Sequence, residues 1–402
     1  MMQRADVIIV GGGLAGLACA LELQAAGVDY LLIEAADSVG GRVRTDDVEG
    51  YRLDRGFQVL LKNYPEANAV LDFDALDLHP FESGVLIRYD GAFHEVADPW
   101  RAPISALRGL TAPIGTLKDK MRVGALRKRA LSYLSDGRFS EDGTAADVLV
   151  SMGFTDAMVN RFFRPFLGGV FLDRDLIVPA EMLYFVFGHF ALGGAAVPSS
   201  GMQAIPDQMV ARLDDHRVLT DTPVSRVEDG QVMSQKGEGF QADHIVMATD
   251  LNGLSALNRS RSGVPNWRGV TCLYFLADKD PVGRPTLVLN GEGAAPINNL
   301  CVPTTVSPAY GPDDKALISV TVLGIADEEI LAQVAGQLVS WYGPDAVGWR
   351  LLKAYYLPHA LPPARSAGPP QNPLVCGDHT THASIEGALL SGKRSAQHLL
   401  SL

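Results

Sequence analysis

The chain has 402 residues, of which 47% are hydrophobic and 20% are charged, and its formal net charge at pH 7 is −12. These values exclude a disordered chain and are typical of a folded protein that is long enough for two domains. The acidic balance argues against nucleic acid as a general partner.

The four cysteines, Cys19, Cys272, Cys301 and Cys376, lie far apart and form no C-x-x-C pair. This spacing predicts reduced thiols in a cytoplasmic protein, with neither a disulfide framework nor a metal cluster. We also expect no transmembrane helix, because the candidate stretch 182–197 contains a histidine and two adjacent glycines and is short for a span.

The first motif along the chain covers residues 5–23, which read ADVIIVGGGLAGLACALEL. A β-branched apolar run at 7–10 predicts a strand that is buried on both faces. Gly11, Gly13 and Gly16 follow at G-x-G-x-x-G spacing, and the next residues have helical periodicity. In such a motif the first glycine permits a tight turn, the second lets a pyrophosphate approach the backbone, and the third lets the helix pack on the strand.

The helix expected after this turn begins at Leu14 and Ala15, and its N-terminal N–H groups would face the pyrophosphate. A second expected strand, 30–33, is followed by Glu34 and Ala35. An acid at this place binds the ribose hydroxyls of an adenosine. The alternative is a glycine-rich turn that binds no ligand, and the second strand with its terminal acid argues against it.

Residues 35–45 read AADSVGGRVRT. Gly40 and Gly41 let the loop fold back over the dinucleotide, and the planar fork of Arg42 suits a phosphate. A solvated basic loop is the alternative, and it suits Arg44 better than Arg42. This stretch resembles the GG-R-x-x-T signature of the flavin amine oxidase, protoporphyrinogen oxidase and carotenoid desaturase superfamily, and the resemblance implies that the dinucleotide is FAD.

The resemblance spans essentially the whole chain and implies an α/β fold. It implies a Rossmann-like FAD/NAD(P)-binding domain (glutathione-reductase-like, amine-oxidase type) and a discontinuous α+β substrate domain with a helical insertion. Three segments are expected in the FAD-binding domain: 1–80, 197–265 and 365–402. Two are expected in the substrate domain: 81–196, with the helical insertion, and 266–364, with a sheet and a covering helix.

Residues 50–61, GYRLDRGFQVLL, resemble a superfamily segment that runs beside the cofactor, with Asp54 and Gly56 at the corresponding places. Residues 84–96 predict a β-hairpin whose turn is an Asp-Gly pair. The chain is expected to leave the dinucleotide domain here.

Residues 101–129 differ in charge from the rest of the chain. They contain eight lysines and arginines against one aspartate, a net charge of +7 that leaves −19 for the remainder. Interleaved apolar residues predict an amphipathic segment, which can contact an anionic membrane surface or attract an acidic substrate. The alternative is a solvated helical face.

Thr144 with Asp147 predicts a capped helix, and Thr155 is expected to cap another helix that runs through Arg164. The following segment, 162–173, reads FFRPFLGGVFLD and resembles a segment of desaturase-like and protoporphyrinogen-oxidase-like members.

More aromatic residues follow at 182–190, so we interpret 100–195 as a helical insertion that helps to form an apolar substrate chamber. Ordinary core packing would give the same composition.

Residues 201–213 resemble the superfamily helix that returns the chain to the flavin domain, and the resemblance implies that the backbone of Val224 passes the adenine. Six prolines within 358–373 predict a loop. Other elements are expected as strands at 222–228, 244–248, 270–277, 286–289, 317–323 and 349–356 and a helix at about 328–341.

A second specific motif lies at 374–397, LVCGDHTTHASIEGALLSGKRSAQ. A strand, a turn at Gly377 and Asp378, and a helix from about Ser384 would bring a second helix N-terminus to the ligand. The resemblance implies that Asp378 binds the ribityl-phosphate region. Cys376 is placed unlike the cysteine that anchors flavin in some amine oxidases, so we expect non-covalent FAD.

The resemblance also implies that this last helix points at the pyrimidine edge of the flavin, where its dipole would stabilise the reduced flavin. The residues that match this helix start are Ile385, Glu386, Gly387 and Ala388.

Two departures from the superfamily concern the substrate. Amine oxidases usually carry an aromatic cage residue where this chain has Thr-Thr-His-Ala at 380–383, and many carry a lysine where it has Thr271 and Cys272. We therefore expect hydride transfer from a bulky, largely apolar substrate to flavin N5, with oxygen or quinone as the electron acceptor. The alternatives are a flavin-containing amine oxidase and a non-catalytic binding protein on the same fold.

His379 and His382 are the candidate catalytic residues, because their loop is expected to lie near the flavin, where either imidazole could carry a proton. The alternative is that one of them hydrogen-bonds the loop backbone. Tyr355, Tyr356 and His359 are candidates for the other face of the flavin, although core packing accounts for them equally well.

Overall fold

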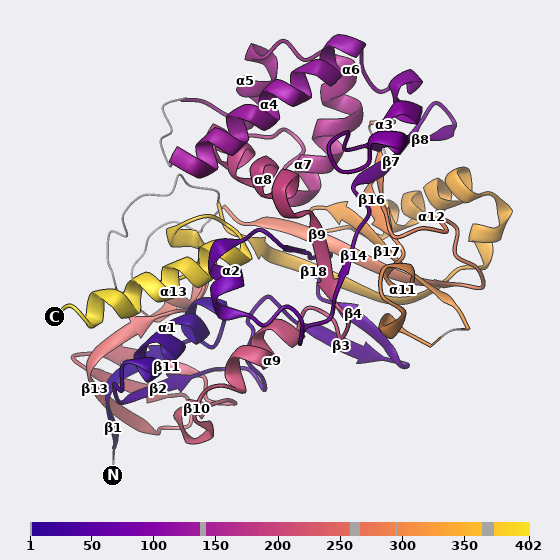
Figure 1. The fold of residues 1–402 in the computed structure, drawn as a ribbon. Helices are drawn as coiled ribbons and strands as arrows, with labels where there is room; N and C mark the ends of the chain where they lie inside the picture. The colour runs from indigo at the N-terminus through magenta and orange to yellow at the C-terminus, as the bar shows by residue number, and fades with distance from the viewer. Residues whose placement is uncertain (1, 137–141, 258–265, 294–295, 313, 364–373) are drawn as a thin grey trace.

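Two β-sheets form the body of the molecule, and a group of helices lies over them (Figure 1). The computed structural model describes residues 2–136, 142–257, 266–293, 296–312, 314–363 and 374–402. Strands and helices alternate along the chain, which confirms the predicted α/β class.

The first sheet has six strands in the order β10-β2-β1-β13-β12-β11. Four of them are parallel, namely β1 (Gln3–Val10), β2 (Tyr30–Ile33), β10 (Val218–Leu219) and β13 (Gly239–Met247). An antiparallel hairpin, β11 (Val224–Glu228) and β12 (Gln231–Ser234), completes one edge. Ile8 and Ile9 in the central β1 are fully buried, as expected for a strand with both faces covered.

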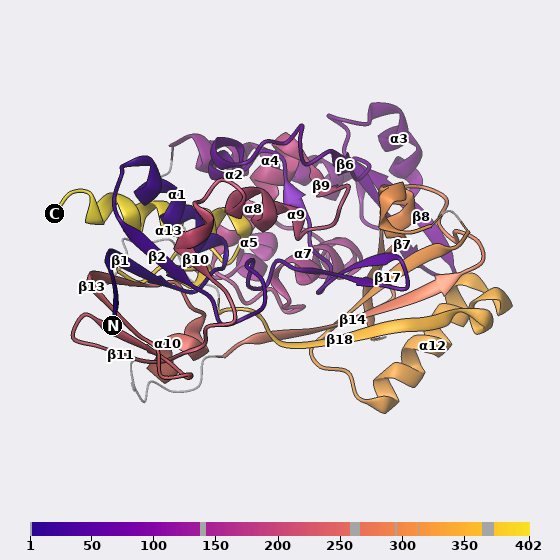
Figure 2. The same ribbon diagram turned by 90° about the horizontal axis from the view of Figure 1, so that it is seen from below.

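Helices from the two ends of the chain pack against each other beside this sheet. They are α1 (Leu14–Ala25) and α13 (Ile385–Leu399), and both views show them side by side (Figures 1 and 2). A Cβ atom at Gly392 would clash with the carbonyl oxygen of Ala15, so the close approach of the helices requires a glycine there. The two predicted ligand-binding motifs are thereby brought together.

The second sheet has seven strands in the order β18-β14-β17-β16-β15-β7-β8. Their bounds are β7 (Gly84–Tyr89), β8 (Ala92–Ala97), β14 (Arg268–Ala277), β15 (Leu287–Asn290), β16 (Ile297–Cys301), β17 (Ala316–Leu323) and β18 (Arg350–Leu361). Helix α12 (Glu328–Tyr342) covers its outer face (Figure 2). The turn between β7 and β8 is made by Asp90 and Gly91, both with positive φ, which confirms the predicted hairpin.

The helical insertion lies above the sheets in Figure 1. It consists of α3 (Pro103–Arg108), α4 (Leu117–Asp136), α5 (Ala145–Ser151), α6 (Asp156–Met158), α7 (Arg164–Phe171) and α8 (Ala180–Gly193). Thr144 and Asp147 form the predicted capping box. Within the described residues, no helix combines the length and the apolar character that crossing a membrane requires.

The helix capped by Thr155 is longer than predicted. Thr155 caps α6, which is followed by a π-helical turn (Val159–Phe163) and by α7. The chain therefore stays helical beyond Arg164 and ends this helical stretch at Phe171. Pro165 does not end the helix, because it occupies the first turn of α7, where the missing N–H is tolerated.

The predicted loop at 358–373 is wrong at its start. β18 continues to Leu361 and includes Pro358. A proline is compatible with this position because β18 is an edge strand and its register against β14 is interrupted nearby. Residues 364–373 lie outside the described part of the chain.

Short elements connect these layers. They are β3 (Thr45–Val48), β4 (Tyr51–Asp54), β5 (Leu60–Leu61), α2 (Pro65–Val70), β6 (Leu78–Pro80), β9 (Ala195–Pro198), α9 (Ala204–Val210), α10 (Leu251–Leu257) and α11 (Pro303–Val306).

Candidate cofactor and substrate site

A cavity of about 1120 Å³ extends from the carboxyl ends of β1 and β2 to helices α4, α7 and α8. Sixteen of the seventeen residues predicted to bind the cofactor line it: Gly11, Gly13, Leu14, Ala15, Glu34, Ala35, Gly40, Gly41, Arg42, Gly56, Val224, Gly377, Asp378, Ser384, Ile385 and Ala388. Gly16 does not. The cavity therefore gathers residues from three distant parts of the chain.

The three glycines of the turn between β1 and α1 have different surroundings. Gly11 has φ +115°, a conformation that favours glycine, and a Cβ at Gly16 would clash with the carbonyl oxygen of Gly11. A Cβ at Gly13 would meet no atom within 4 Å. Gly13 is also the N-cap of α1 and gives that helix no side-chain cap. The helix N-terminus is therefore open toward a ligand in the cavity.

Glu34 is held at the end of β2 by two backbone hydrogen bonds. Its Oε2 accepts from the N–H of Gly12 at 2.6 Å, and its Oε1 accepts from the N–H of Ala36 at 2.8 Å. Each carboxylate oxygen retains a lone pair for a further donor. The side chain lines the cavity beside the glycine turn, where it could accept from ribose hydroxyls.

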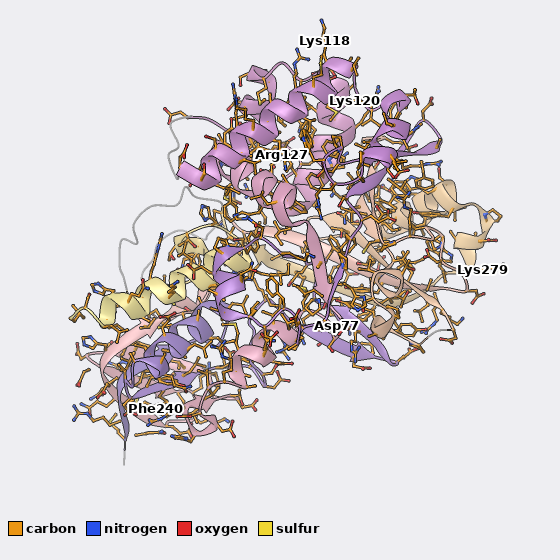
Figure 3. The ribbon with its side chains drawn as sticks, viewed as in Figure 1. Asp77, Lys118, Lys120, Arg127, Phe240 and Lys279 are labelled. Atoms are coloured by element: carbon orange, nitrogen blue, oxygen red, sulfur yellow. The ribbon has the colours of Figure 1, made fainter. Side chains whose placement is uncertain are left out.

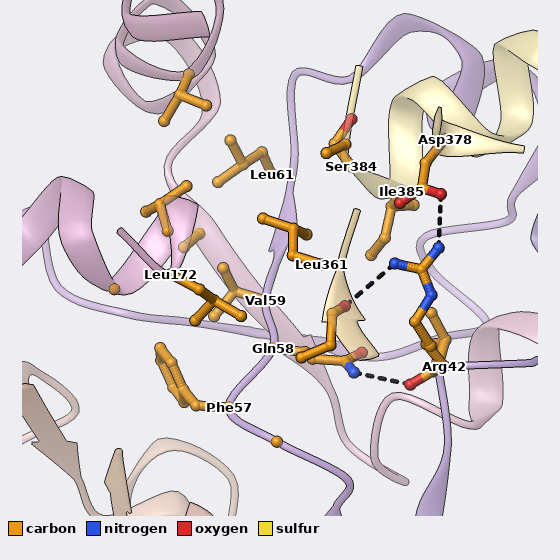
Figure 4. A pocket seen from close by; sticks show the side chains of 18 of the residues that line it. Arg42, Phe57, Gln58, Val59, Leu61, Leu172, Leu361, Asp378, Ser384 and Ile385 are labelled. Atoms are coloured by element: carbon orange, nitrogen blue, oxygen red, sulfur yellow. Dashed lines mark hydrogen bonds and ion pairs between the residues drawn. The ribbon is translucent and has the colours of Figure 1, made fainter. Parts of the chain in front are cut away.

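Arg42 and Asp378 form an ion pair across the cavity wall (Figure 4). Nη2 of Arg42 lies 2.5 Å from Oδ1 of Asp378, and Nη1 donates to the carbonyl oxygen of Ala360 at 3.1 Å. The amide of Gln58 donates to the carbonyl oxygen of Arg42 at 2.9 Å. Both charged residues were predicted at the cofactor, and in the protein alone they bind each other.

The last helix, α13, presents its N-terminus to the same cavity. Oγ of Ser384 accepts from the N–H of Gly387 at 3.0 Å and caps the helix. Glu386 does not line the cavity, since its carboxylate accepts from the N–H groups of Glu66 and Ala67 in α2. Burial raises the pKa of Glu386 above its ordinary value.

The two candidate catalytic histidines have different positions. His379 lines the cavity. The structure does not bring His382 there, because its ring stacks on Phe185 at 4.3 Å and its Nε2 lies 3.5 Å from Oε1 of Glu181. The loop turns inward at Thr381, whose hydroxyl donates to the carbonyl oxygen of Gly387. A catalytic role for either histidine stays a prediction.

Other residues proposed near the flavin also separate. His359 lines the cavity, whereas Tyr356 is exposed and Tyr355 donates to Asp46 at 2.8 Å. Asp54 is buried outside the cavity, where it accepts hydrogen bonds from Tyr310 and two other groups. Burial raises its pKa, and its contacts are those of a structural residue.

The far part of the cavity is lined by aromatic side chains of α7, α8 and the turn before α7. The rings of Phe162 and Phe166 stack at 5.5 Å, and the ring of Phe190 meets that of Phe166 edge-on at 5.1 Å. Figure 4 shows further apolar side chains of the cavity lining to one side of the Arg42–Asp378 pair, including Phe57, Val59, Leu61, Leu172 and Leu361. The cavity therefore has a polar end and an apolar end.

Some lining residues were missed in the sequence. Ala248, Thr249 and Asp250 follow β13, the parallel neighbour of β1, with Val10 opposite Met247. The carboxyl ends of neighbouring parallel strands face one crevice, so the predicted strand at 244–248 contained the signal for these residues.

These features fit a dinucleotide. Gly13 leaves room for a group against the backbone, and the buried Oγ1 of Thr249 has no hydrogen-bond partner among the described residues. Among the residues that the structure describes, no three His, Cys, Asp or Glu side chains gather as a metal site. Residues 14–400 match the family model described as flavin containing amine oxidoreductase. The chain belongs to this family. Its cofactor is FAD.

Curated relatives of this flavin-containing chain catalyse different reactions. It is 27% identical over 60% of its length to putrescine oxidase of Kocuria rosea, and 27% identical over 64% to coproporphyrinogen III oxidase of Mycobacterium bovis. The matches span 52% and 61% of these two relatives. A putative protoporphyrinogen oxidase from Exiguobacterium has the same fold, with a TM-score of 0.71, 18% identity and full coverage of both chains.

Proposed function

We propose that the protein is an FAD-dependent oxidoreductase whose substrate is bulky and largely apolar. The observation that carries this proposal is one continuous cavity, whose polar end has the features of an FAD site and whose other end is lined by phenylalanines. FAD, when bound, supplies a hydride acceptor at flavin N5. The hydride leaves the substrate with the electron pair of its bond. Oxygen or a quinone would later take these two electrons from the reduced cofactor.

The residues of the chamber bind and orient the substrate. Phe162, Phe166 and Phe190 offer ring faces and edges to an apolar molecule and exclude water around it. Burial of apolar surface contributes about 25 cal/mol per Å². A large apolar substrate therefore gains much more from this chamber than a small cation does.

His379 is the proposed proton carrier at the cavity. It is the one of the two candidate histidines that lines the cavity, and an imidazole there could take a proton that the substrate releases together with the hydride. His382 acts instead as a packing residue between Phe185 and Glu181 in this proposal.

Amine oxidation is the second candidate, because putrescine oxidase is among the relatives. The local contacts favour it less. Thr271 donates to the carbonyl oxygen of Gly324, and Cys272 is buried against Ser319, at the two positions where many amine oxidases carry a lysine. Residues 380–383 contribute no tyrosine or tryptophan ring to the cavity, and an aromatic cage would add about 0.5–2 kcal/mol for a cation.

Anaerobic bleaching of the flavin tests the substrate class. Purified protein is mixed with benzylamine, a polyamine, a carotenoid precursor or a porphyrinogen, and a quinone then permits turnover. We expect bleaching by an apolar compound and not by the amines, and bleaching by the amines alone would contradict the proposal. Acid precipitation of the same protein should leave the yellow FAD in the supernatant, whereas colour in the pellet would indicate a covalent link.

A further inference from the structure

Helix α4 presents one face to the far end of the cavity. Lys120, Val123 and Arg127 line the cavity at spacings of three and four residues, as expected for one side of a helix. Figure 3 shows Lys120 and Arg127 along this helix in the upper part of the molecule. Two cations thus face a chamber whose neighbouring walls are aromatic.

Arg127 has no acidic partner among the described residues. Its Nε is buried and has no hydrogen-bond partner in the part of the chain that the structure describes, and one Nη lies 3.5 Å from the carbonyl oxygen of Ala191. The guanidinium lies 4.9 Å from the centre of the Trp100 ring, which stabilises the cation only partly. A half-buried guanidinium with an unused donor favours an anionic ligand, because such a ligand offers two acceptor oxygens to the planar fork.

The charged side chains around Arg127 are compatible with its preference for an anion. Lys120 donates to the carbonyl oxygen of Gly109 at 2.9 Å, and burial lowers its pKa. Two acids line the same part of the cavity. Glu82 is paired with Arg284, and Oδ1 of Asp98 accepts from the N–H of Trp100.

We propose that this end of the cavity is an anion subsite, and that the substrate is an apolar molecule with a carboxylate at one end. Arg127 binds the carboxylate with its guanidinium, and the ammonium group of Lys120 contributes a second positive charge. The apolar body of the substrate then lies among the phenylalanines with its other end toward the FAD site. This proposal rests on the proposed function, since it names the class of molecule that the chamber takes.

The test uses the FAD-loaded protein and three ligands of equal length: decanoic acid, 1-decanol and decylamine. Binding is measured by calorimetry and by the change in flavin absorbance. We expect decanoic acid to bind about ten- to a hundredfold more tightly than 1-decanol, as charge-assisted hydrogen bonds to a carboxylate imply. Decylamine should bind most weakly, because it brings a second cation to Arg127.

The variant Arg127→Gln should reduce decanoic acid binding to the level of 1-decanol and leave 1-decanol binding unchanged. Lys128→Gln is the matched control, because it removes the same charge from an exposed neighbour on α4 and should have no effect. Equal binding of acid and alcohol to the unaltered protein, or a preference for acid that survives Arg127→Gln, would overturn the anion subsite and leave the apolar chamber standing. Failure of all three ligands to bind would overturn the chamber itself.

A separate observation concerns the outer surface of α3 and the start of α4. Five large apolar side chains are exposed between residues 100 and 121: Trp100 (49%), Ile104 (72%), Leu107 (67%), Leu117 (66%) and Met121 (65%). Exposed cations, Arg101 and Lys118, lie among them. Trp100 and Arg101 also line the cavity, so this surface adjoins the chamber.

We infer that this α3–α4 surface docks on an anionic phospholipid membrane. The apolar side chains can enter the interface between headgroups and acyl chains, and the cations can contact lipid phosphates. The charge of this surface favours this occupant, because its exposed cations Arg101 and Lys118 lie in a chain of net charge −12, while Lys120 and Arg127 of the same basic segment face the cavity. A membrane at this position would let an apolar substrate pass directly into the chamber.

Co-sedimentation with vesicles tests this surface. We expect binding to phosphatidylcholine vesicles that contain 30% phosphatidylglycerol and weaker binding to pure phosphatidylcholine. Ile104→Ser with Leu107→Ser should lower binding about tenfold or more, whereas the control Val347→Ser, an equally exposed residue elsewhere, should not change it. Unchanged vesicle binding by the double variant would overturn the proposal, and so would a change in sedimentation velocity that shows the surface joins two copies of the chain.

Discussion

The two ends of the cavity are built from different parts of the polypeptide. The end of the cavity that is predicted to bind FAD, called the FAD end, is formed by backbone turns and helix N-termini, and Gly13, Glu34 and Ser384 line it. The chamber end is formed by side chains on helices, with Phe166 and Arg127 as examples. A site made of backbone requires particular residues at fixed spacing, whereas a site made of side chains tolerates many sequences.

This difference decides what a variant does at each end. Changes at the FAD end should act through cofactor affinity, and changes at the chamber end should act through ligand affinity with FAD retained. The following variants separate the two ends, beginning with the largest expected effect.

Gly13→Ala should lower FAD affinity without loss of stability, whereas Gly16→Ala should lower the stability of the protein itself. A Cβ at Gly13 meets no protein atom, and its φ of −70° suits alanine, so the apoprotein should keep its melting temperature and bind FAD about a hundredfold more weakly. A Cβ at Gly16 clashes with backbone, so that variant should unfold at lower temperature even without FAD. Calorimetric unfolding and FAD titration check both. Equal melting losses for the two variants would refute the separate roles.

Glu34→Gln should weaken FAD binding with little effect on the chamber. The neutral amide loses the charge-assisted acceptance from ribose hydroxyls, at a cost of about 1.5–3 kcal/mol, or about ten- to a hundredfold in affinity, and it also weakens the bonds from the N–H groups of Gly12 and Ala36 that hold the side chain in place. Titration of apoprotein with FAD measures this change. Asp37→Asn is the control, since Asp37 pairs with Arg44 outside the cavity. Similar losses in both variants would contradict the assignment.

Asp119→Asn should destabilise the helical insertion and leave FAD affinity unchanged. Burial alone would raise the pKa of Asp119, but hydrogen bonds from Thr155 and Thr116 lower it to about 2. The carboxylate therefore contributes about 2 kcal/mol of folding free energy above pH 4, and this contribution disappears as the pH falls toward 2. Unfolding followed by circular dichroism between pH 5 and 2 should show the variant and the parent converging. A constant gap would exclude this linkage.

Phe166→Ala should have the smallest effect and only on apolar ligands. Loss of its contacts with Phe162 and Phe190 should weaken 1-decanol binding about two- to tenfold, with FAD content unchanged. Phe93→Ala, which removes a ring outside the cavity, is the matched control and should leave 1-decanol binding as it is. Loss of FAD from the Phe166 variant would mean that the two ends are not separable.

The residues that the sequence predicted at the FAD end come together in one cavity because they are specified locally, and their contact with FAD stays a prediction. The spacing of Gly11, Gly13 and Gly16 determines the turn, and the chain needs no distant partner to make it. His382 could not be placed in the same way. Its position depends on a stacking contact with Phe185, which belongs to a helix almost two hundred residues earlier.

The sequence also predicted the boundaries between elements less accurately than the elements themselves. Pro358 indicated a loop, yet it extends an edge strand that tolerates a missing N–H. The basic stretch was recognised by charge alone, and only the fold shows that Lys120 and Arg127 face the cavity while Lys118 faces outward. The domain boundaries predicted from the sequence stay predictions.

The central claim is that one cavity takes FAD at its glycine-rich end and an apolar ligand at its phenylalanine-lined end. A crystal structure of the protein reconstituted with FAD and soaked with 1-decanol tests it most directly. The account predicts the pyrophosphate at the N–H groups of Leu14 and Ala15 and the alkyl chain among Phe162, Phe166 and Phe190. A dinucleotide bound away from the start of α1, or an alkyl chain found only outside the cavity, would contradict it.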